Sequence, residues 1–216
     1  MICLRNMDII QLYNPGVTID KVPTDIFNNL KEKVLQKREL SDTFNNYRKS
    51  ALQILSIKEI DDTPYFPEME EYLNQSFLRW RDIFNVSCEK FIMDPVWTNY
   101  MRATEYAPMH NHSPAIASFV IWVQVPYEFK NEKQVHYEGN IESINNKNGT
   151  FEFMYSSYTG AIEVSRILLD SSYEGTIIFF PGNMMHCVYP FFSTSKQRIS
   201  VSGNFYCLEA FRNNKI

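Results

Sequence analysis

Long apolar runs, paired cysteines and an excess of basic residues are all missing from this 216-residue sequence. No stretch approaches the ~20 apolar residues of a membrane-spanning helix. The first residues, MICLRNMDIIQL, lack the basic and apolar regions of a secretion signal. The four cysteines form no C-x-x-C pair, which argues against a disulfide framework and a thiolate zinc site. We therefore expect a cytoplasmic protein without membrane contact.

Strong net charge is also missing, since the formal net charge is -4. This balance disfavours nucleic-acid binding, although a local basic patch would still permit it. Hydrophobic residues make up 44% of the chain and aromatic residues 15%, so one domain of this length can bury a core. An exposed edge strand in such a domain would offer a homodimer contact.

The chain changes character near residue 95. Apolar residues recur at three- and four-residue intervals over 23–40 and 67–84, which predicts two amphipathic helices. Short β-branched and aromatic runs follow, in the segments VWTNYMRATEY, IASFVIWVQV, FEFMYSS, TIIFFPG, MHCVYPFF and QRISVSGNFY. Between them, residues 127–150 are polar and aperiodic, and we expect an insertion there.

This pattern predicts a single α+β domain, mainly β, over residues 1–216. The helical part, 1–94, would pack on one sheet of a jelly roll formed by residues 95–216.

Histidine is scarce, with four in the chain, yet His110 and His112 lie two residues apart on an extended segment. That spacing places both side chains on one face. His186 follows FFPGNMM, a segment typical of a strand and a tight turn. Because histidine is the commonest metal ligand, we predict that these three histidines converge on one ion. The fourth, His136, lies in the insertion, where we expect a surface residue.

The segment RISVSGN predicts an anion site. Arg198 and Ser200 alternate with apolar residues, so their side chains share one face of a strand. If the apolar residues pack in the core, the polar ones line a cavity, and a buried arginine needs an anion. A carboxylate held by Arg198 and a serine hydroxyl would meet that need.

The ordered set H-x-H, FFPGNMMH and R-x-S, over residues 95–206, resembles the non-haem iron, 2-oxoglutarate-dependent oxygenases. Within them it is similar to small members frequent in phages of marine bacteria. The resemblance implies a double-stranded β-helix, a jelly-roll variant, and an enzyme that hydroxylates a substrate of unknown identity. For a phage-encoded member, the location would be the cytoplasm of the bacterial host.

The same resemblance assigns roles to individual residues. It implies Fe(II) on His110, His112 and His186, and 2-oxoglutarate as the co-substrate, held by Arg198 and Ser200. Asn99 and Tyr106 precede the H-x-H segment where related enzymes place further co-substrate contacts, so both are candidates. The family usually carries Asp or Glu at the position of His112, which completes its two-His, one-carboxylate site.

Two other functions fit the same residues. A three-His dioxygenase of the cupin type would oxidise its substrate without 2-oxoglutarate, and Arg198 would then hold the substrate's own carboxylate. A non-catalytic jelly-roll binding or assembly module would keep a vestigial or structural metal site. Formation of succinate distinguishes the 2-oxoglutarate-dependent oxygenase from the cupin-type dioxygenase. Metal content distinguishes it from the binding module.

Overall fold

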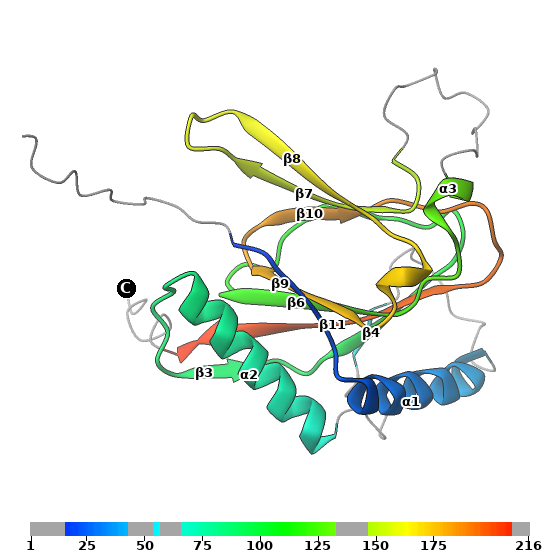
Figure 1. The fold of residues 1–216 in the computed structure, drawn as a ribbon, viewed down its shortest axis with the longest axis horizontal. Coiled ribbons are helices and arrows are strands. Elements are labelled where there is room, and N and C mark those ends of the chain that lie inside the picture. Colours follow the sequence, from blue (N-terminus) through cyan, green and yellow to red (C-terminus); the bar gives the residue numbers. More distant parts are fainter. Residues whose placement is uncertain (1–15, 43–53, 57–65, 133–146, 209–216) are drawn as a thin grey trace, which may run out of the picture.

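Two antiparallel sheets face each other in the computed structural model, which describes residues 16–42, 54–56, 66–132 and 147–208 (Figure 1). The larger sheet runs in the order β1 (Thr18–Lys21), β9 (Thr176–Pro181), β6 (Ala117–Gln124), β11 (Arg198–Cys207), β4 (Trp97–Met101) and β2 (Ile54–Ser56), and β3 (Phe91–Met93) pairs with β11. The smaller sheet runs in the order β5 (Ala107–His110), β10 (Met185–Val188), β7 (Thr150–Ser156) and β8 (Ile162–Leu168). The predicted jelly roll is confirmed.

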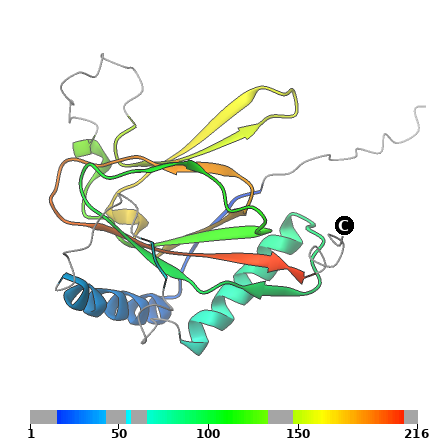
Figure 2. The same ribbon diagram turned by 180° about the vertical axis from the view of Figure 1, so that it is seen from behind.

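Two helices, α1 (Thr24–Asp42) and α2 (Pro67–Ile83), cover the outer face of the larger sheet, as Figures 1 and 2 show from opposite sides. Helix α2 begins with a proline at its first turn, where the missing N–H costs nothing. Its buried Phe77 stacks on Phe205 of β11, with ring centroids 4.4 Å apart. No helix of the described segments is long and apolar enough to cross a membrane.

Strict alternation along β11 sends its two sets of side chains to opposite sides of the larger sheet. Ile199, Val201 and Phe205 belong to the core beneath the helices. The residues between them therefore face the smaller sheet, because neighbouring side chains of a strand point to opposite faces. This places the polar set of β11, Arg198, Ser200, Ser202 and Asn204, between the two sheets.

The two ends of the predicted polar insertion, 127–150, are buried and form regular structure, whereas the sequence predicted a polar, aperiodic segment. Tyr127, Glu132 and Thr150 are 4%, 0% and 0% exposed. A short helix, α3 (Phe129–Glu132), follows Tyr127, and β7 begins at Thr150. The Glu132 carboxylate accepts hydrogen bonds from two backbone N–H groups at 2.7 and 2.8 Å, which compensates its burial. His136 and its neighbours, 133–146, lie outside the described residues.

Candidate metal centre

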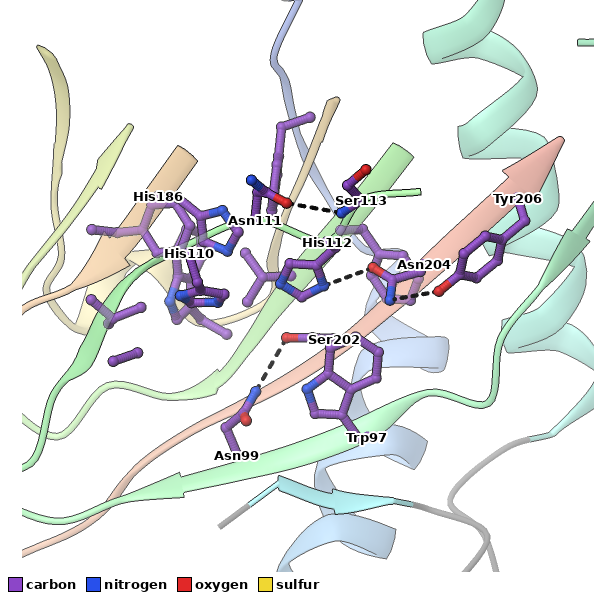
Figure 3. A pocket seen from close by; sticks show the side chains of 17 residues that line it. Trp97, Asn99, His110, Asn111, His112, Ser113, His186, Ser202, Asn204 and Tyr206 are labelled. Carbon is purple, nitrogen blue, oxygen red and sulfur yellow. Dashed lines mark hydrogen bonds between the residues drawn. The ribbon is translucent and has the colours of Figure 1, made fainter. Parts of the chain in front are cut away.

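Three histidines, two on adjacent strands of the smaller sheet and one just after β5, meet at one point between the sheets (Figure 3). His110 ends β5 and pairs directly with His186 of β10, and His112 follows two residues after His110. One nitrogen of each ring lies within 4.8 Å of the others. The ring centroids are 4.3, 5.1 and 5.3 Å apart. The structure thus brings together the three histidines predicted as ligands.

In each of these imidazoles, Nδ1 lies within hydrogen-bonding distance of an oxygen atom. His110 Nδ1 lies 2.6 Å from the Pro108 carbonyl and His186 Nδ1 lies 3.0 Å from the Met184 carbonyl. His112 Nδ1 lies 2.9 Å from the side-chain oxygen of Asn204. An amide oxygen only accepts, so each Nδ1 is the donor, and in the neutral ring Nε2 then keeps its lone pair. The three rings therefore offer Nε2 to a metal ion.

Burial keeps two of the rings neutral. The pKa of His186 falls to about 3, chiefly through desolvation, and the nearby His110 and His112 act in the same direction against the hydrogen bond to the Met184 carbonyl. Desolvation and then His110 lower the pKa of His112 as well, opposed by the hydrogen bond to Asn204. Neutral imidazole is the form that binds metal, so these rings need not lose a proton near neutral pH.

The histidines open onto a cavity of about 460 Å³ between the sheets. Aromatic side chains form much of its wall, among them Trp97, Trp122, Phe151 and Phe180. No Asp, Glu, Lys or Arg is among the described residues that line it. Such a neutral, largely apolar wall with a few polar groups is typical of a small-molecule site.

Arg198 is buried, lies outside the lining of this cavity, and has no acidic partner among the described residues. Its side chain is 2% exposed, and within the described segments no carboxylate forms an ion pair with it. The guanidinium donates to the Tyr127 hydroxyl at 2.7 Å and to the Tyr189 carbonyl at 3.0 Å. A buried cation with only neutral partners favours the arrival of an anion.

The other predicted co-substrate residues lie in different places. Asn99 lines the cavity, and its side-chain amide donates to Ser202 at 3.2 Å and to Ser200 at 3.5 Å. Ser200 is half-buried on the same strand face as Arg198 but is not part of the cavity lining. Tyr106 is 53% exposed and also lies outside the lining.

Two residues of the site had no assigned role in the sequence analysis. Asn204 contacts His112; it belongs to the same polar alternation as Arg198 in RISVSGN, but that pattern gave it no role. Tyr127 contacts Arg198, and no sequence signal marks it, since it opens a polar segment. Both contacts depend on which strands are neighbours in the fold.

The sequence matches the family model described as 2OG-Fe(II) oxygenase over residues 95–204, about half of the chain. The matched region begins just before β4 and ends at Asn204, so it contains all three clustered histidines and Arg198. No curated protein matches the sequence. None of these findings bears on the resemblance to marine-phage members, which stays a prediction.

Solved structures share the fold at low sequence identity. A prolyl hydroxylase from Trichoplax adhaerens, solved with a hypoxia inducible factor peptide, is 9% identical, with a TM-score of 0.60 and coverage of 94% of this chain and 88% of that one. A Pseudomonas putida prolyl-4-hydroxylase is 12% identical, with a TM-score of 0.53 and coverage of 89% and 93%. The alpha-ketoglutarate-dependent epimerase SnoN from nogalamycin biosynthesis is 9% identical, with a TM-score of 0.56 and coverage of 89% and 78%.

Proposed function

This chain belongs to the 2OG-Fe(II) oxygenase family, and from that premise we propose that His110, His112 and His186 hold its ferrous ion. The observation that carries the proposal is the convergence of one nitrogen from each ring within 4.8 Å. Imidazole suits iron as well as zinc, copper and nickel, so the donor set fits the family's metal. The Nδ1 hydrogen bonds support the assignment, because they direct Nε2 of every ring to the ion.

The far carboxylate of 2-oxoglutarate is assigned to Arg198, whose buried guanidinium has no acidic partner among the described residues. The guanidinium contacts the carbonyl of Tyr189, three residues after His186 on the same chain segment. At ~3.3 Å per residue, these backbone positions are roughly 10 Å apart. A five-carbon dicarboxylate that contacts the metal at one end and the guanidinium at the other has a suitable length for the distance between them.

Ser200 and Asn99 are proposed as secondary contacts of the co-substrate. Ser200 shares a strand face with Arg198, and the Asn99 amide reaches the Ser200 hydroxyl. Tyr106 is left out of the proposal because it is half exposed and lies away from the cavity lining.

Bound iron and 2-oxoglutarate supply the oxidising chemistry, in which dioxygen is consumed, the co-substrate becomes succinate and carbon dioxide, and the substrate is oxidised. The residues of this chain fix the geometry. Three imidazoles set the position of the ion, and Arg198 sets the direction of the co-substrate. The aromatic walls of the cavity, including Trp122 and Phe151, present apolar surface to a substrate bound between them.

Anaerobic titration with ferrous iron and then 2-oxoglutarate tests the proposal. The expected result is a weak visible charge-transfer band that needs both components, followed by succinate formation when oxygen is admitted. Succinate also separates this function from the cupin-type alternative, which makes none. A protein that binds iron but gives neither the band nor succinate contradicts the proposal.

Replacement of the arginine tests the co-substrate assignment. Arg198→Ala should abolish 2-oxoglutarate binding and leave the iron content unchanged, because the guanidinium contacts none of the imidazoles. Arg198→Lys keeps the charge but cannot form a bidentate contact with a carboxylate, so this variant should bind 2-oxoglutarate more weakly than the native protein. Native affinity in Arg198→Ala contradicts the assignment.

Hydroxylation is proposed as the outcome of the reaction. Two hydroxylases and one epimerase share this fold, so the fold is compatible with either result. Candidate substrates can be screened with isotopically labelled dioxygen. A hydroxylase incorporates one labelled oxygen atom into the product, whereas product formation without the label contradicts hydroxylation.

A further inference from the structure

We propose that Asn204 is the positioning residue for His112, an inference that rests on the proposed metal site. Its side-chain oxygen lies 2.9 Å from His112 Nδ1 and accepts the proton there. The contact joins the segment just after β5 to β11 in the larger sheet, as Figure 3 shows. Asn204 thereby selects the tautomer that directs His112 Nε2 to the metal.

His112 differs from the other two ligands in the origin of its hydrogen-bond partner. His110 and His186 each use the backbone carbonyl two residues earlier, from Pro108 and Met184. These are backbone carbonyls, so their positions depend on the local chain conformation and a side-chain substitution does not remove them. His112 instead depends on a single side chain that is 92 positions away in the sequence. Only this ligand can lose its partner through one substitution.

The Asn204 amide is itself held in one orientation. Ser118 donates to the same oxygen at 2.8 Å, and the amide nitrogen points toward the Tyr206 hydroxyl at 3.5 Å. A flipped amide would put a donor opposite the Nδ1–H of His112, which leaves that proton without this acceptor. The contacts of Asn204 therefore reinforce the orientation that His112 requires.

Trp97 completes the support of the His112 ring. The two rings stack with centroids 5.7 Å apart and an angle of 16° between their planes. Stacking fixes the plane of the imidazole, and the hydrogen bond to Asn204 fixes its rotation within that plane. With both fixed, His112 can occupy the position where the family usually carries a carboxylate.

Titration of the metal-free protein with cobalt(II), under anaerobic conditions and without co-substrate, tests the proposal. Asn204→Ala should weaken cobalt binding by about 10- to 100-fold, the usual effect of removing a ligand's hydrogen-bond partner. Asn204→Asp keeps an acceptor of the same size and should bind at least as tightly as the native protein. Ser118→Ala, which removes only the support of the amide, should have a smaller effect than Asn204→Ala.

Asn111→Ala is the matched control. Asn111 lies between His110 and His112, but its side chain contacts Met185 and the backbone of Ser113 rather than an imidazole. It should keep the native cobalt affinity. If Asn204→Ala also keeps the native affinity, or if Asn111→Ala weakens binding equally, Asn204 has no positioning role.

The tautomer of His112 in the native protein provides a second readout that does not depend on any variant folding. Long-range ¹H–¹⁵N NMR of the metal-free protein should show His112 protonated at Nδ1. An Nε2-protonated ring overturns the inference even if both Asn204 variants fail to fold. If native protein with the Nδ1 tautomer binds no metal, the proposed metal site fails and the positioning contact stands.

Discussion

At the scale of single residues, burial decides which form of an imidazole the fold accepts. His186 is 4% exposed and packs against Phe151 and Phe180, with ring centroids 5.6 and 4.9 Å from its own. Such surroundings disfavour the charged ring, so the fold retains the neutral form that a metal requires. The same burial makes the metal-free protein sensitive to acid.

We predict that the metal-free protein loses stability as the pH falls from about 6.5 toward 3. The pKa of His186 is about 3 in the folded chain, whereas an unperturbed histidine has a pKa of 6.5. Between these values the unfolded chain binds a proton that the folded chain does not, which favours unfolding. The contribution to the free energy of unfolding is about 1.4 kcal/mol per pH unit.

Urea denaturation at several pH values measures this slope. In His186→Gln the slope should be shallower by that amount, whatever the variant's stability at neutral pH. Equal slopes in the native protein and the variant show that the fold does not disfavour a charged His186.

Tyr127 is expected to matter for co-substrate binding through Arg198. Tyr127→Phe removes the acceptor of one Arg198 N–H group, and a hydrogen bond to a charged group contributes enough that KM for 2-oxoglutarate should rise ~10-fold. The kcat should change little, since the hydroxyl does not line the cavity. The readout is succinate formation at varied 2-oxoglutarate.

Tyr106→Phe provides the comparison, because the sequence analysis named Tyr106 as a co-substrate residue. From its exposure, this variant should keep the native KM. If Tyr106→Phe raises KM and Tyr127→Phe does not, the sequence-based choice was right and the contact with Arg198 has no role in binding.

At the scale of elements, the turn between β9 and β10 controls the approach of the H-x-H segment. The Gly182 carbonyl accepts a hydrogen bond from the His112 backbone N–H at 2.7 Å. A Cβ at position 182 would lie 2.2 Å from the Ala115 carbonyl oxygen, so only glycine fits without displacing backbone. This close approach holds the segment after His112 against the turn that precedes His186.

Gly182→Ala should therefore disturb the metal site as well as the fold. We expect a loss of about 1–3 kcal/mol in the free energy of unfolding, typical of a forced contact in a packed region, together with weaker cobalt binding. Gly160→Ala is the control, since Gly160 has φ +83° and open space around it. It should cost about 1 kcal/mol of backbone strain and keep the native cobalt affinity. Equal cobalt affinity in both variants contradicts the role of the turn.

Strands with a strong sequence signal were predictable, and those without one were not. Within the run TIIFFPG, residues TIIFFP form β9, and all six of them are buried. In contrast β8, IEVSRIL, was missed because six of its seven residues are exposed and its pattern is mixed. Pairing with β7 along its whole length forms this strand, and such pairing is not encoded in the segment itself.

The candidate site was predictable to the extent that its chemistry is local in sequence. Residue type and spacing are enough to recognise the H-x-H pair, His110 and His112, and the histidine after the Pro-Gly turn. Asn204 and Tyr127 act only through partners on distant segments. Their roles follow from β11 lying beside β6 and opposite the smaller sheet, which no single segment specifies.

At the scale of the whole molecule, a metal ion would connect two strands of the smaller sheet with a segment that is hydrogen-bonded to the larger sheet. His110 and His186 are cross-strand neighbours in the smaller sheet, and His112 is hydrogen-bonded to the larger sheet through Asn204. An ion on all three rings would stabilise both the pairing of β5 with β10 and the contact between the sheets.

Metal binding should accordingly raise the melting temperature. Cobalt(II) at a hundred times its Kd should stabilise the fold by ~2.7 kcal/mol, a rise of roughly 5–10 °C for a chain of this size. In His110→Ala, thermal denaturation with and without cobalt should show no such rise. No rise in the native protein favours the non-catalytic binding module instead.

The neutral lining of the cavity has a consequence for the charge of what can bind there. A ferrous ion brings two positive charges, Arg198 a third, and doubly negative 2-oxoglutarate cancels only two of them. With His112 in place of the usual carboxylate, and no acidic side chain among the described residues of the wall, one positive charge remains uncompensated. A substrate with a negative group near its reacting carbon would neutralise the loaded site, whereas a cationic one would meet repulsion in a medium of low dielectric.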